Sequence, residues 1–173
     1  MKGNIMNEKY KVAVVTMSDK GSIGQRVDES GPLIAEMMEK WGLASVEDMI
    51  VIPDDFNKIK ETLISLCDDM KVDLILTTGG TGLSPRDVTP EATMAIADRN
   101  VPGIAEYMRA KSFEITPKAM LSRAASVMRG KTLIINLPGS PKAVRENLEF
   151  ILPALDHGLE IMTGRSGECG NSR

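Results

Sequence analysis

Hydrophobic residues along this chain fall into two patterns, and the two patterns alternate from one end of the sequence to the other. Continuous apolar stretches of strand length, rich in β-branched residues, occur at residues 11–18 (KVAVVTMS) and 72–78 (VDLILTT). A weaker stretch of the same kind covers residues 44–52. Stretches of this composition are typical of strands that are buried on both faces, as in a parallel sheet.

Between these stretches, hydrophobic residues recur every three or four positions, which is the spacing of one face of a helix. The first such segment follows Gly31 and Pro32 and ends at Gly42, and we assign its methionines to the core. Three such faces are Leu33, Ile34, Met37, Met38 and Trp41; Phe56, Ile59, Leu63, Leu66 and Met70; and Val144, Leu148, Ile151, Leu155 and Leu159. Pro153 predicts a kink in the last of these helices.

Three further helix starts are marked by a hydroxyl residue followed by proline, at Thr89, Thr116 and Ser140. A hydroxyl is a good N-cap and proline suits the first helical position, so we expect each of these residues to cap a helix. Between the last two, residues 125–128 and 132–137 are predicted to be strands that an Arg-Gly pair joins in a tight hairpin. This hairpin adds an antiparallel strand to the sheet.

Strands that alternate with helices predict an α/β fold, a three-layer sandwich with a mainly parallel sheet carrying an antiparallel strand. The chain length of 173 residues suits one hydrophobic core. We expect a single domain at residues 11–163, with a flexible N-terminal extension at residues 1–10 and a flexible polar tail at residues 164–173.

Composition narrows the class of protein without changing this fold. Apolar residues make up 42% of the chain and charged residues 26%, as in an ordinary globular protein, which excludes disorder and a coiled coil for the whole chain. No apolar stretch approaches the roughly 20 residues that span a bilayer, and residues 1–10 lack the apolar core of a secretory signal, so we expect a cytoplasmic protein with no membrane contact. A net charge of -3 argues against a nucleic-acid partner.

Cysteine and histidine are too few for a structural zinc site. The chain has Cys67, Cys169 and a single histidine, His157, whereas such a site takes four Cys or His ligands. We expect Cys67 to fill an apolar position in the core, and we assign no role to His157.

In open α/β sheets, ligands bind outside the carboxyl ends of the strands, and this rule points to four loops. These loops are residues 19–28, 53–55, 79–89 and 138–140. The third loop lies in the segment with the densest candidate chemistry, residues 77–92 (TTGGTGLSPRDVTPEA).

Two common phosphate-binding motifs do not fit this segment. No Lys-Ser or Lys-Thr pair follows the glycines, which excludes a P-loop, and Pro85 stands where a dinucleotide-binding fingerprint needs its third glycine. What remains is a run of glycines whose exposed amides can approach an anion closely, followed by Arg86, Asp87 and a helix N-terminus.

Residues 79–82 (GGTG), together with residues 86–92 (RDVTPEA), resemble the signature of the molybdenum-cofactor biosynthesis family of MogA, MoaB and the gephyrin G domain. Three other segments resemble motifs of this family and occur in the expected order. They are residues 16–19 (TMSD), 52–54 (IPD) and 136–142 (NLPGSPK), so that the resemblance covers nearly the whole chain.

The resemblance implies a three-layer α/β fold that assembles as a homotrimer. It also implies magnesium-dependent transfer of the adenylyl group of ATP to molybdopterin, with release of pyrophosphate and use of the product by a downstream molybdate-insertion enzyme. Adenylyl transfer needs neutralised phosphates and an in-line arrangement of the reacting groups. Magnesium held by one or two carboxylates supplies that charge.

Family members have aspartates implicated in catalysis at the positions of Asp54 and Asp87, so we assign both residues to catalysis and to binding of magnesium. Arg86, beside the glycines, favours contact with a phosphate. The substrate-binding residues implied by the matching motifs are Ser18, Asp19, Thr78, Gly79, Gly80, Thr81, Gly82, Arg86, Thr89, Pro138, Gly139, Ser140 and Lys142.

Several of these assignments have a structural alternative. We take Asp55 as the N-cap of the following helix and Asp54 as the chemical group, but the reverse stays open. Asp87 is a catalytic residue or the cap of a turn, and Asp19 binds pterin or magnesium or only orders its loop. Lys142 is an anion contact or an exposed helix lysine, and the glycines serve a phosphate or only permit tight turns.

Two other functions also stay open. One is a MoaB-type protein that binds pterin without turnover, although this chain keeps Asp87 and Thr89, where such proteins depart from the motif. The other is a CinA-like domain that acts on nucleotides, a type that usually adjoins a second enzymatic domain.

Overall fold

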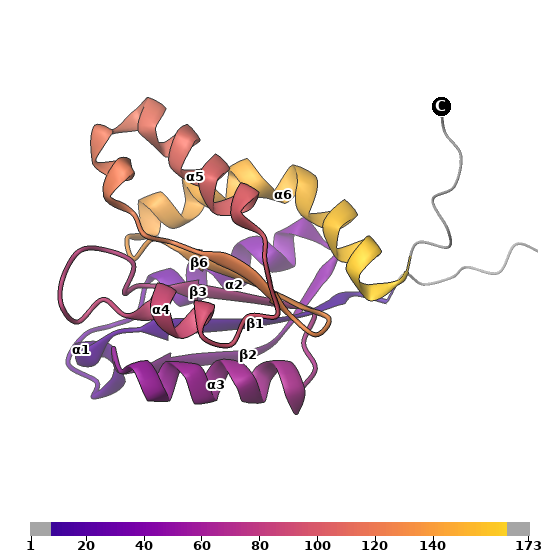
Figure 1. Ribbon diagram of the computed structural model, residues 1–173, viewed down its shortest axis with the longest axis horizontal. Helices are drawn as coiled ribbons and strands as arrows, with labels where there is room; N and C mark the ends of the chain where they lie inside the picture. The colour runs from indigo at the N-terminus through magenta and orange to yellow at the C-terminus, as the bar shows by residue number, and fades with distance from the viewer. Residues whose placement is uncertain (1–7, 166–173) are drawn as a thin grey trace, which may run out of the picture.

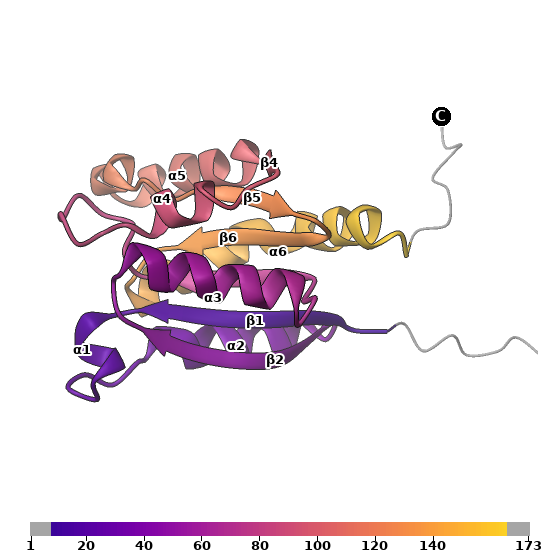
Figure 2. The same ribbon diagram turned by 60° about the horizontal axis from the view of Figure 1, so that its bottom comes forward.

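The computed structural model describes residues 8–165 and contains one six-stranded sheet in the order β2-β1-β3-β6-β5-β4 (Figures 1 and 2). Strands β2, β1, β3 and β6 are parallel to one another, whereas β5 runs antiparallel to both β6 and β4. The strands are β1 (Tyr10–Met17), β2 (Ala44–Ile52), β3 (Leu74–Thr78), β4 (Arg99–Asn100), β5 (Ser126–Arg129) and β6 (Thr132–Leu137).

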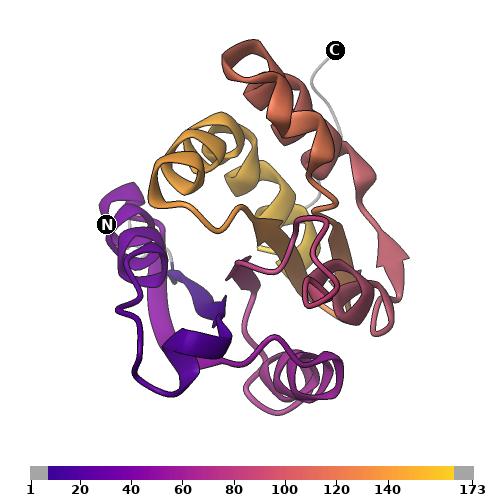
Figure 3. The same ribbon diagram turned by 90° about the vertical axis from the view of Figure 1, so that its left-hand side faces the viewer.

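Helices cover both faces of this sheet, which confirms the predicted three-layer sandwich. The helices are α1 (Asp19–Ser22), α2 (Ser30–Trp41), α3 (Phe56–Asp68), α4 (Thr89–Met94), α5 (Pro102–Ile115), the 3-10 helix η1 (Pro117–Leu121) and α6 (Pro141–Thr163). In the view along the strands, α2, α5 and α6 lie on one side of the sheet and α3 and α4 on the other (Figure 3). No helix within residues 8–165 is both long and apolar enough to cross a bilayer.

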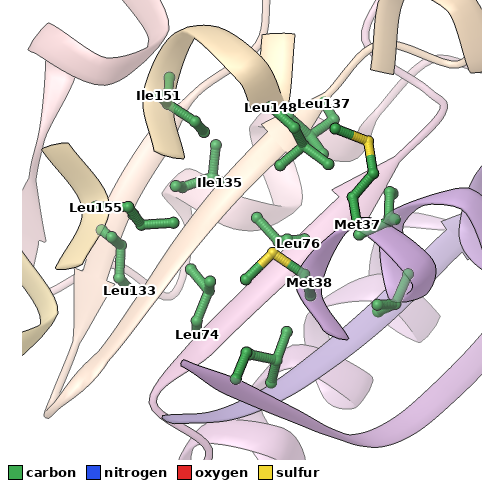
Figure 4. Packing of buried hydrophobic residues seen from close by; sticks show 14 of the residues in the cluster. Met37, Met38, Leu74, Leu76, Leu133, Ile135, Leu137, Leu148, Ile151 and Leu155 are labelled. Carbon is green, nitrogen blue, oxygen red and sulfur yellow. The ribbon is translucent and has the colours of Figure 1, made fainter. Parts of the chain in front are cut away.

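Two hydrophobic cores form because successive residues of a buried strand point to opposite faces. Leu74 and Leu76 of β3 pack with α2 and α6, while Ile75 between them packs with α3 and α4. Met37 and Met38 lie in the first core beside Leu76, as expected for the methionines of α2 (Figure 4). Cys67 is buried in the second core, and burial raises the pKa of its thiol to about 11, which agrees with its predicted apolar role.

The predicted helix caps are correct in two cases of three. Ser140 caps α6, because its Oγ accepts a hydrogen bond from the Ala143 amide at 3.3 Å. Thr116 caps η1, a short 3-10 helix, because its hydroxyl oxygen accepts a hydrogen bond from the Lys118 amide at 3.4 Å. The cap at Thr89 is wrong: Thr89 lies inside α4, and its hydroxyl donates to the Gly79 carbonyl at 3.0 Å.

Three elements lack a counterpart in the sequence-based expectations: the short helix α1, which lies in the expected 19–28 loop, helix α5 and strand β4. Helix α5 begins with Pro102 after Val101, which has no side chain that can cap, and buries only Ala105 and Met108. Its weak amphipathic pattern explains why it was missed. Strand β4 consists of two residues, both exposed, and pairs only with β5. Such a short polar segment has no apolar pattern from which a strand could be predicted.

The hairpin follows the expected course, whereas the kink expected at Pro153 in the last helix stays a prediction. Strands β5 and β6 pair antiparallel through a turn in which Gly130 has a φ of +54°. Helix α6 continues unbroken through Pro153.

The predicted flexible termini lie mostly outside the described residues, which exclude 1–7 and 166–173. Within the described part, Tyr10 opens β1, is buried and donates a hydrogen bond to the Asp156 carboxylate at 2.9 Å. The Arg165 guanidinium lies 4.6 Å from the centre of the Tyr10 ring. These contacts tie both ends of the described chain to the sheet.

Candidate functional site

The carboxyl ends of the parallel strands β1, β2, β3 and β6 meet at one edge of the sheet, which faces the viewer in Figure 3. The loops that follow these strands surround a cavity of about 560 Å³, which we call the main cavity. Its lining includes eight of the predicted site residues: Ser18, Asp54, Thr78, Gly79, Gly80, Asp87, Gly139 and Ser140. The sheet thus gathers segments that are far apart in the sequence.

Asp54, directly after β2, lies in this cavity and is fixed by an exchange of hydrogen bonds with Asp19. The Asp19 amide donates to the Asp54 carboxylate at 3.1 Å, and the Asp54 amide donates to the Asp19 carboxylate at 3.0 Å. Burial raises the pKa of Asp54 above its ordinary value, and the negative charges of Asp19 and Asp87 act in the same direction. A cation in the cavity would relieve this repulsion.

The neighbouring Asp55 has a structural role. Its carboxylate accepts a hydrogen bond from the Lys58 amide at 2.8 Å and so caps α3. Because Asp55 is the cap and Asp54 lines the cavity, the structure places the two residues as the sequence analysis assigned them.

Arg86 and Asp19 form an ion pair beside the cavity. The guanidinium donates to both carboxylate oxygens of Asp19, at 3.0 and 2.8 Å. This hydrogen bonding holds the pKa of the Asp19 carboxyl below its ordinary value. Neither residue lines the main cavity. In this structure Asp19 joins its loop to the Arg86 loop, and the predicted contacts of Asp19 and Arg86 with substrate stay predictions.

The glycine-rich loop needs its first two glycines for steric reasons. Gly79 and Gly80 have φ angles of +92° and +66°, a region that disfavours other residues. A Cβ on Gly79 would lie 2.4 Å from the Met17 carbonyl oxygen, and one on Gly80 would lie 2.2 Å from the Thr89 hydroxyl and 3.0 Å from the Asp54 carboxylate. The loop is therefore both a tight turn and a close approach of backbone to the cavity wall.

Asp87 closes a turn and also lines the main cavity, so its position is compatible with both roles that the sequence left open. Its Oδ2 accepts a hydrogen bond from the Ser84 amide at 2.9 Å, which closes a turn in the loop. Within residues 8–165, its other oxygen accepts no hydrogen bond, and the residue lines the main cavity. Arg123 holds the same loop from outside by donating to the backbone carbonyls of Gly82 and Asp87.

A second cavity, of about 310 Å³, lies on the other side of the glycine-rich loop, between α5, η1 and α6. Its lining includes three predicted site residues, Thr81, Gly82 and Pro138, with Ala105, Met108, Arg109, Ser112, Leu121, Ser122, Glu146 and Asn147 among the others. Residues 79–82 and 138–140 thus contribute to the walls of both cavities.

Besides Asp19 and Arg86, two further predicted site residues, Thr89 and Lys142, line neither cavity. Thr89 is fully buried and supports the loop through its bond to Gly79. The Lys142 side chain is 82% exposed, and its ammonium group lies 3.9 Å from the Glu146 carboxylate, as expected of an exposed helix lysine.

The sequence pointed to the loop at residues 19–28, but sequence reasoning singled out neither Arg26 nor Asp28 within it. Arg26 and Asp28 line the main cavity, and Asp28 accepts hydrogen bonds from the Ser30 and Gly31 amides and from the Thr16 hydroxyl. The Ser30 hydroxyl donates to the Gly139 carbonyl at 2.9 Å. The pattern Asp-x-Ser before a helix is a capping signal that could have identified Asp28, whereas nothing in the sequence marks Arg26.

The donor set of the main cavity suits magnesium bound together with substrate. Asp54 and Asp87 contribute two carboxylates to it. Among residues 8–165, no group of three or more His, Cys, Asp or Glu residues could hold a metal ion alone. Magnesium accepts such a partial protein site, because it is commonly bound by one or two carboxylates plus phosphate oxygens and waters.

Comparison with known proteins adds to this geometry. Residues 13–157 match the family described as "probable molybdopterin binding domain". The molybdopterin adenylyltransferase of Helicobacter pylori strain J99 is 40% identical over 154 residues, which cover 88% of each chain. The enzyme of the same name from Escherichia coli K12 is 43% identical over 145 residues, covering 83% of this chain and 74% of that one.

A similar solved structure is the molybdopterin biosynthesis enzyme MoaB of Thermus thermophilus. It superposes with a TM-score of 0.85 and is 48% identical. The superposition covers 90% of this chain and 97% of the other.

Proposed function

The chain belongs to the molybdopterin binding domain family of molybdenum-cofactor biosynthesis, and from this premise we propose that it is a molybdopterin adenylyltransferase, which transfers AMP from ATP to molybdopterin. One structural observation carries the proposal. Asp54 and Asp87 reach the same polar cavity from different strands, beside the backbone of Gly79 and Gly80. Two carboxylates beside exposed glycine backbone suit a metal-bound polyphosphate.

In the proposed reaction, a phosphate oxygen of molybdopterin attacks the α-phosphorus of ATP. A new P–O bond forms, the bond from the α-phosphorus to the bridging oxygen breaks, and pyrophosphate leaves with the electron pair of that bond. The chain's own residues bind and orient the two substrates, because this chemistry requires chiefly in-line geometry and charge neutralisation.

Asp54 and Asp87 would hold magnesium in this site. When bound, the ion would neutralise charge on the phosphates of ATP. Asp19 keeps the Asp54 carboxylate in place through the exchanged hydrogen bonds, and the turn bond from Ser84 keeps that of Asp87 in place. The repulsion that helps to raise the pKa of Asp54 in the absence of an ion supports the assignment.

Two parts of the backbone would bind phosphate. The first is the glycine-rich loop, where the backbone of Gly79 and Gly80 lines the main cavity and leaves no room for a Cβ. The second is the N-terminus of α6, which opens at Ser140 onto the main cavity and carries the positive end of a 23-residue helix.

The two cavities match a reaction with two substrates. The main cavity contains the carboxylates and suits the triphosphate, whereas the second cavity has a wall of apolar side chains such as Met108 and Leu121 that suits a flat ring. The glycine-rich loop separates them, so a group passed from one substrate to the other would cross at this loop. We therefore place ATP phosphates in the main cavity and the pterin in the second.

The trimeric assembly, the downstream molybdate-insertion enzyme and the cytoplasmic location extend this proposal and rest on the family resemblance and the sequence. One surface feature supports self-association. Apolar side chains of α5 and α6, including Tyr107, Phe150 and Ile161, surround a shallow cavity of about 810 Å³ on the outside of the molecule.

The proposal is tested by incubating the purified protein with molybdopterin, ATP and magnesium and identifying the products by mass spectrometry. Adenylylated molybdopterin, absent when any component is omitted, is the expected product. Pterin binding without this product would identify a MoaB-type binding protein. Nucleotide conversion that is independent of molybdopterin would identify a CinA-like activity.

A further inference from the structure

The charges around the main cavity are unbalanced. Four carboxylate residues line it: Asp28, Glu29, Asp54 and Asp87. Arg26 is the one cationic side chain among its lining residues. A nucleoside triphosphate brings further negative charge into this space, so each cation that reaches it has a large effect on affinity.

The other cations near the glycine-rich loop are already bound to partners. Arg86 donates to both oxygens of Asp19. Arg123 is paired with Glu91 and donates to two backbone carbonyls. In contrast, the exposed guanidinium of Arg26 forms no hydrogen bond and no ion pair within residues 8–165.

The backbone on both sides of Arg26 is held in place. On the N-terminal side, the Gln25 amide donates to the Lys20 carbonyl at 2.9 Å. On the C-terminal side, Asp28 accepts the Thr16 hydroxyl at 2.7 Å and the Ser30 amide at 3.1 Å. The side chain of Arg26 therefore projects from an anchored loop, which limits the entropy lost when it binds a ligand.

We propose that Arg26 binds a phosphate group of the nucleotide in the main cavity. This inference rests on the proposed function, since it takes the polyphosphate of ATP as the ligand. A guanidinium can donate two parallel hydrogen bonds to one phosphate, which an ammonium group cannot. Arg26 contributes to binding and to the orientation of the phosphates, while Asp54 and Asp87 hold the metal.

The test uses pyrophosphate, which contains the relevant anion and needs no turnover, and measures its binding to the full chain by calorimetry. Arg26→Gln is expected to weaken binding on the order of tenfold, since it removes a charge-assisted contact. Arg26→Lys is expected to lose about threefold, because the charge stays and the forked geometry does not. A melting temperature equal to that of the native protein shows that the fold of each variant is intact.

Lys20→Gln is the matched control. Lys20 is exposed, lies in the adjoining helix α1 and lines neither cavity, yet its substitution changes the net charge by the same amount. It is expected to bind pyrophosphate like the native protein. If Lys20→Gln and Arg26→Gln lose the same affinity for pyrophosphate, the effect is one of long-range charge alone, and the inference is overturned.

A steady-state assay separates this inference from the proposed function. Arg26→Gln is expected to raise the KM for ATP about tenfold with little change in kcat. If the native protein adenylylates molybdopterin and Arg26→Gln binds pyrophosphate as tightly as the native protein, the role of Arg26 is refuted and the proposed function stands. If Arg26→Gln weakens pyrophosphate binding but the native protein yields no adenylylated product, the binding role stands and the proposed function fails.

Discussion

Asp19 and Asp54 each donate a backbone amide hydrogen to the carboxylate of the other, although 35 residues separate them. The two bonds join the loops that follow β1 and β2. Asp19 also accepts the Arg86 guanidinium, so the exchange links Asp54 to the loop that contains Asp87. The position of the Asp54 carboxylate thus depends on three segments of the chain.

Asp54→Asn separates the chemistry of this carboxylate from its contribution to stability. Burial raises the pKa of Asp54 in the folded chain above its ordinary value of 3.8. The free energy of unfolding therefore falls as the pH rises from 3.8 through the raised pKa of the folded state. The uncharged amide removes this loss and can still accept the Asp19 amide. We expect the metal-free variant, in EDTA, to melt at the same or a higher temperature than the native protein at pH 7, and the difference to shrink below pH 3.8.

Adenylyl transfer by Asp54→Asn is expected to fall at least about 100-fold, since a metal ligand is lost. Melting curves and initial rates of the same preparations check both expectations. A variant that is much less stable than the native protein at pH 7 would show that the charge of Asp54 stabilises the fold.

Gly80→Ala tests whether the glycine-rich loop is confined by its neighbours. A methyl group there would meet the Thr89 hydroxyl, and the φ of +66° costs about 1 kcal/mol for a residue with a Cβ. The control is Gly130→Ala, which has a φ of +54° in the β5–β6 turn and no atom within 4 Å of the added methyl group.

In urea unfolding, Gly80→Ala is expected to lose about 1 to 3 kcal/mol more than Gly130→Ala, the usual cost of overpacking. If the two variants lose the same free energy of unfolding, the loop can move away from the added methyl group. Glycine would then be needed at residue 80 only for its positive φ angle.

Magnesium binding is expected to depend on nucleotide. Two carboxylates hold this ion weakly, whereas carboxylates and phosphate oxygens together complete its coordination. Calorimetric titration should therefore show weak binding to the protein alone and much tighter binding with a non-hydrolysable ATP analogue present. Tight binding without nucleotide would contradict the shared coordination by Asp54, Asp87 and phosphate.

Self-association is expected to yield a trimer, with three times the chain mass of 18.8 kDa. Light scattering coupled to gel filtration measures this mass directly at micromolar concentration. Ile161→Glu, at a side chain of α6 that is 58% exposed, should reduce the mass if the apolar surface of α5 and α6 forms the contact. A native protein that is monomeric at this concentration would refute the trimer.

The layers of the fold could be predicted from the sequence because strands such as β3 are apolar on both faces and α3 and α6 have regular apolar faces. Helix α5 could not be predicted, since it buries only Ala105 and Met108 and starts without a capping side chain. The prediction that Thr89 caps a helix was wrong because the glycine-rich loop folds back to the start of α4. There the Thr89 hydroxyl donates a hydrogen bond to the Gly79 carbonyl.

The candidate site shows the same limit. Asp54, Asp87 and the glycines follow strands, so their meeting at one sheet edge follows from topology. The pairing of Arg86 with Asp19 depends on two loops 67 residues apart, and the contact of Ser30 with Gly139 spans 109 residues. Neither contact has a local sequence signal, and for this reason the environment of Arg26 became visible only in the folded chain.

The rate at which native protein and Asp87→Asn transfer labelled AMP from ATP to molybdopterin tests the account most directly. Asparagine can still accept the Ser84 amide, so the turn, the melting temperature and pterin binding should stay close to native. Loss of a transition-state contact of about 3 to 4 kcal/mol predicts a rate on the order of 100- to 1,000-fold lower, against measurable transfer by the native protein. No transfer by the native protein, or equal rates for the two proteins, would contradict catalysis by Asp87 in this cavity.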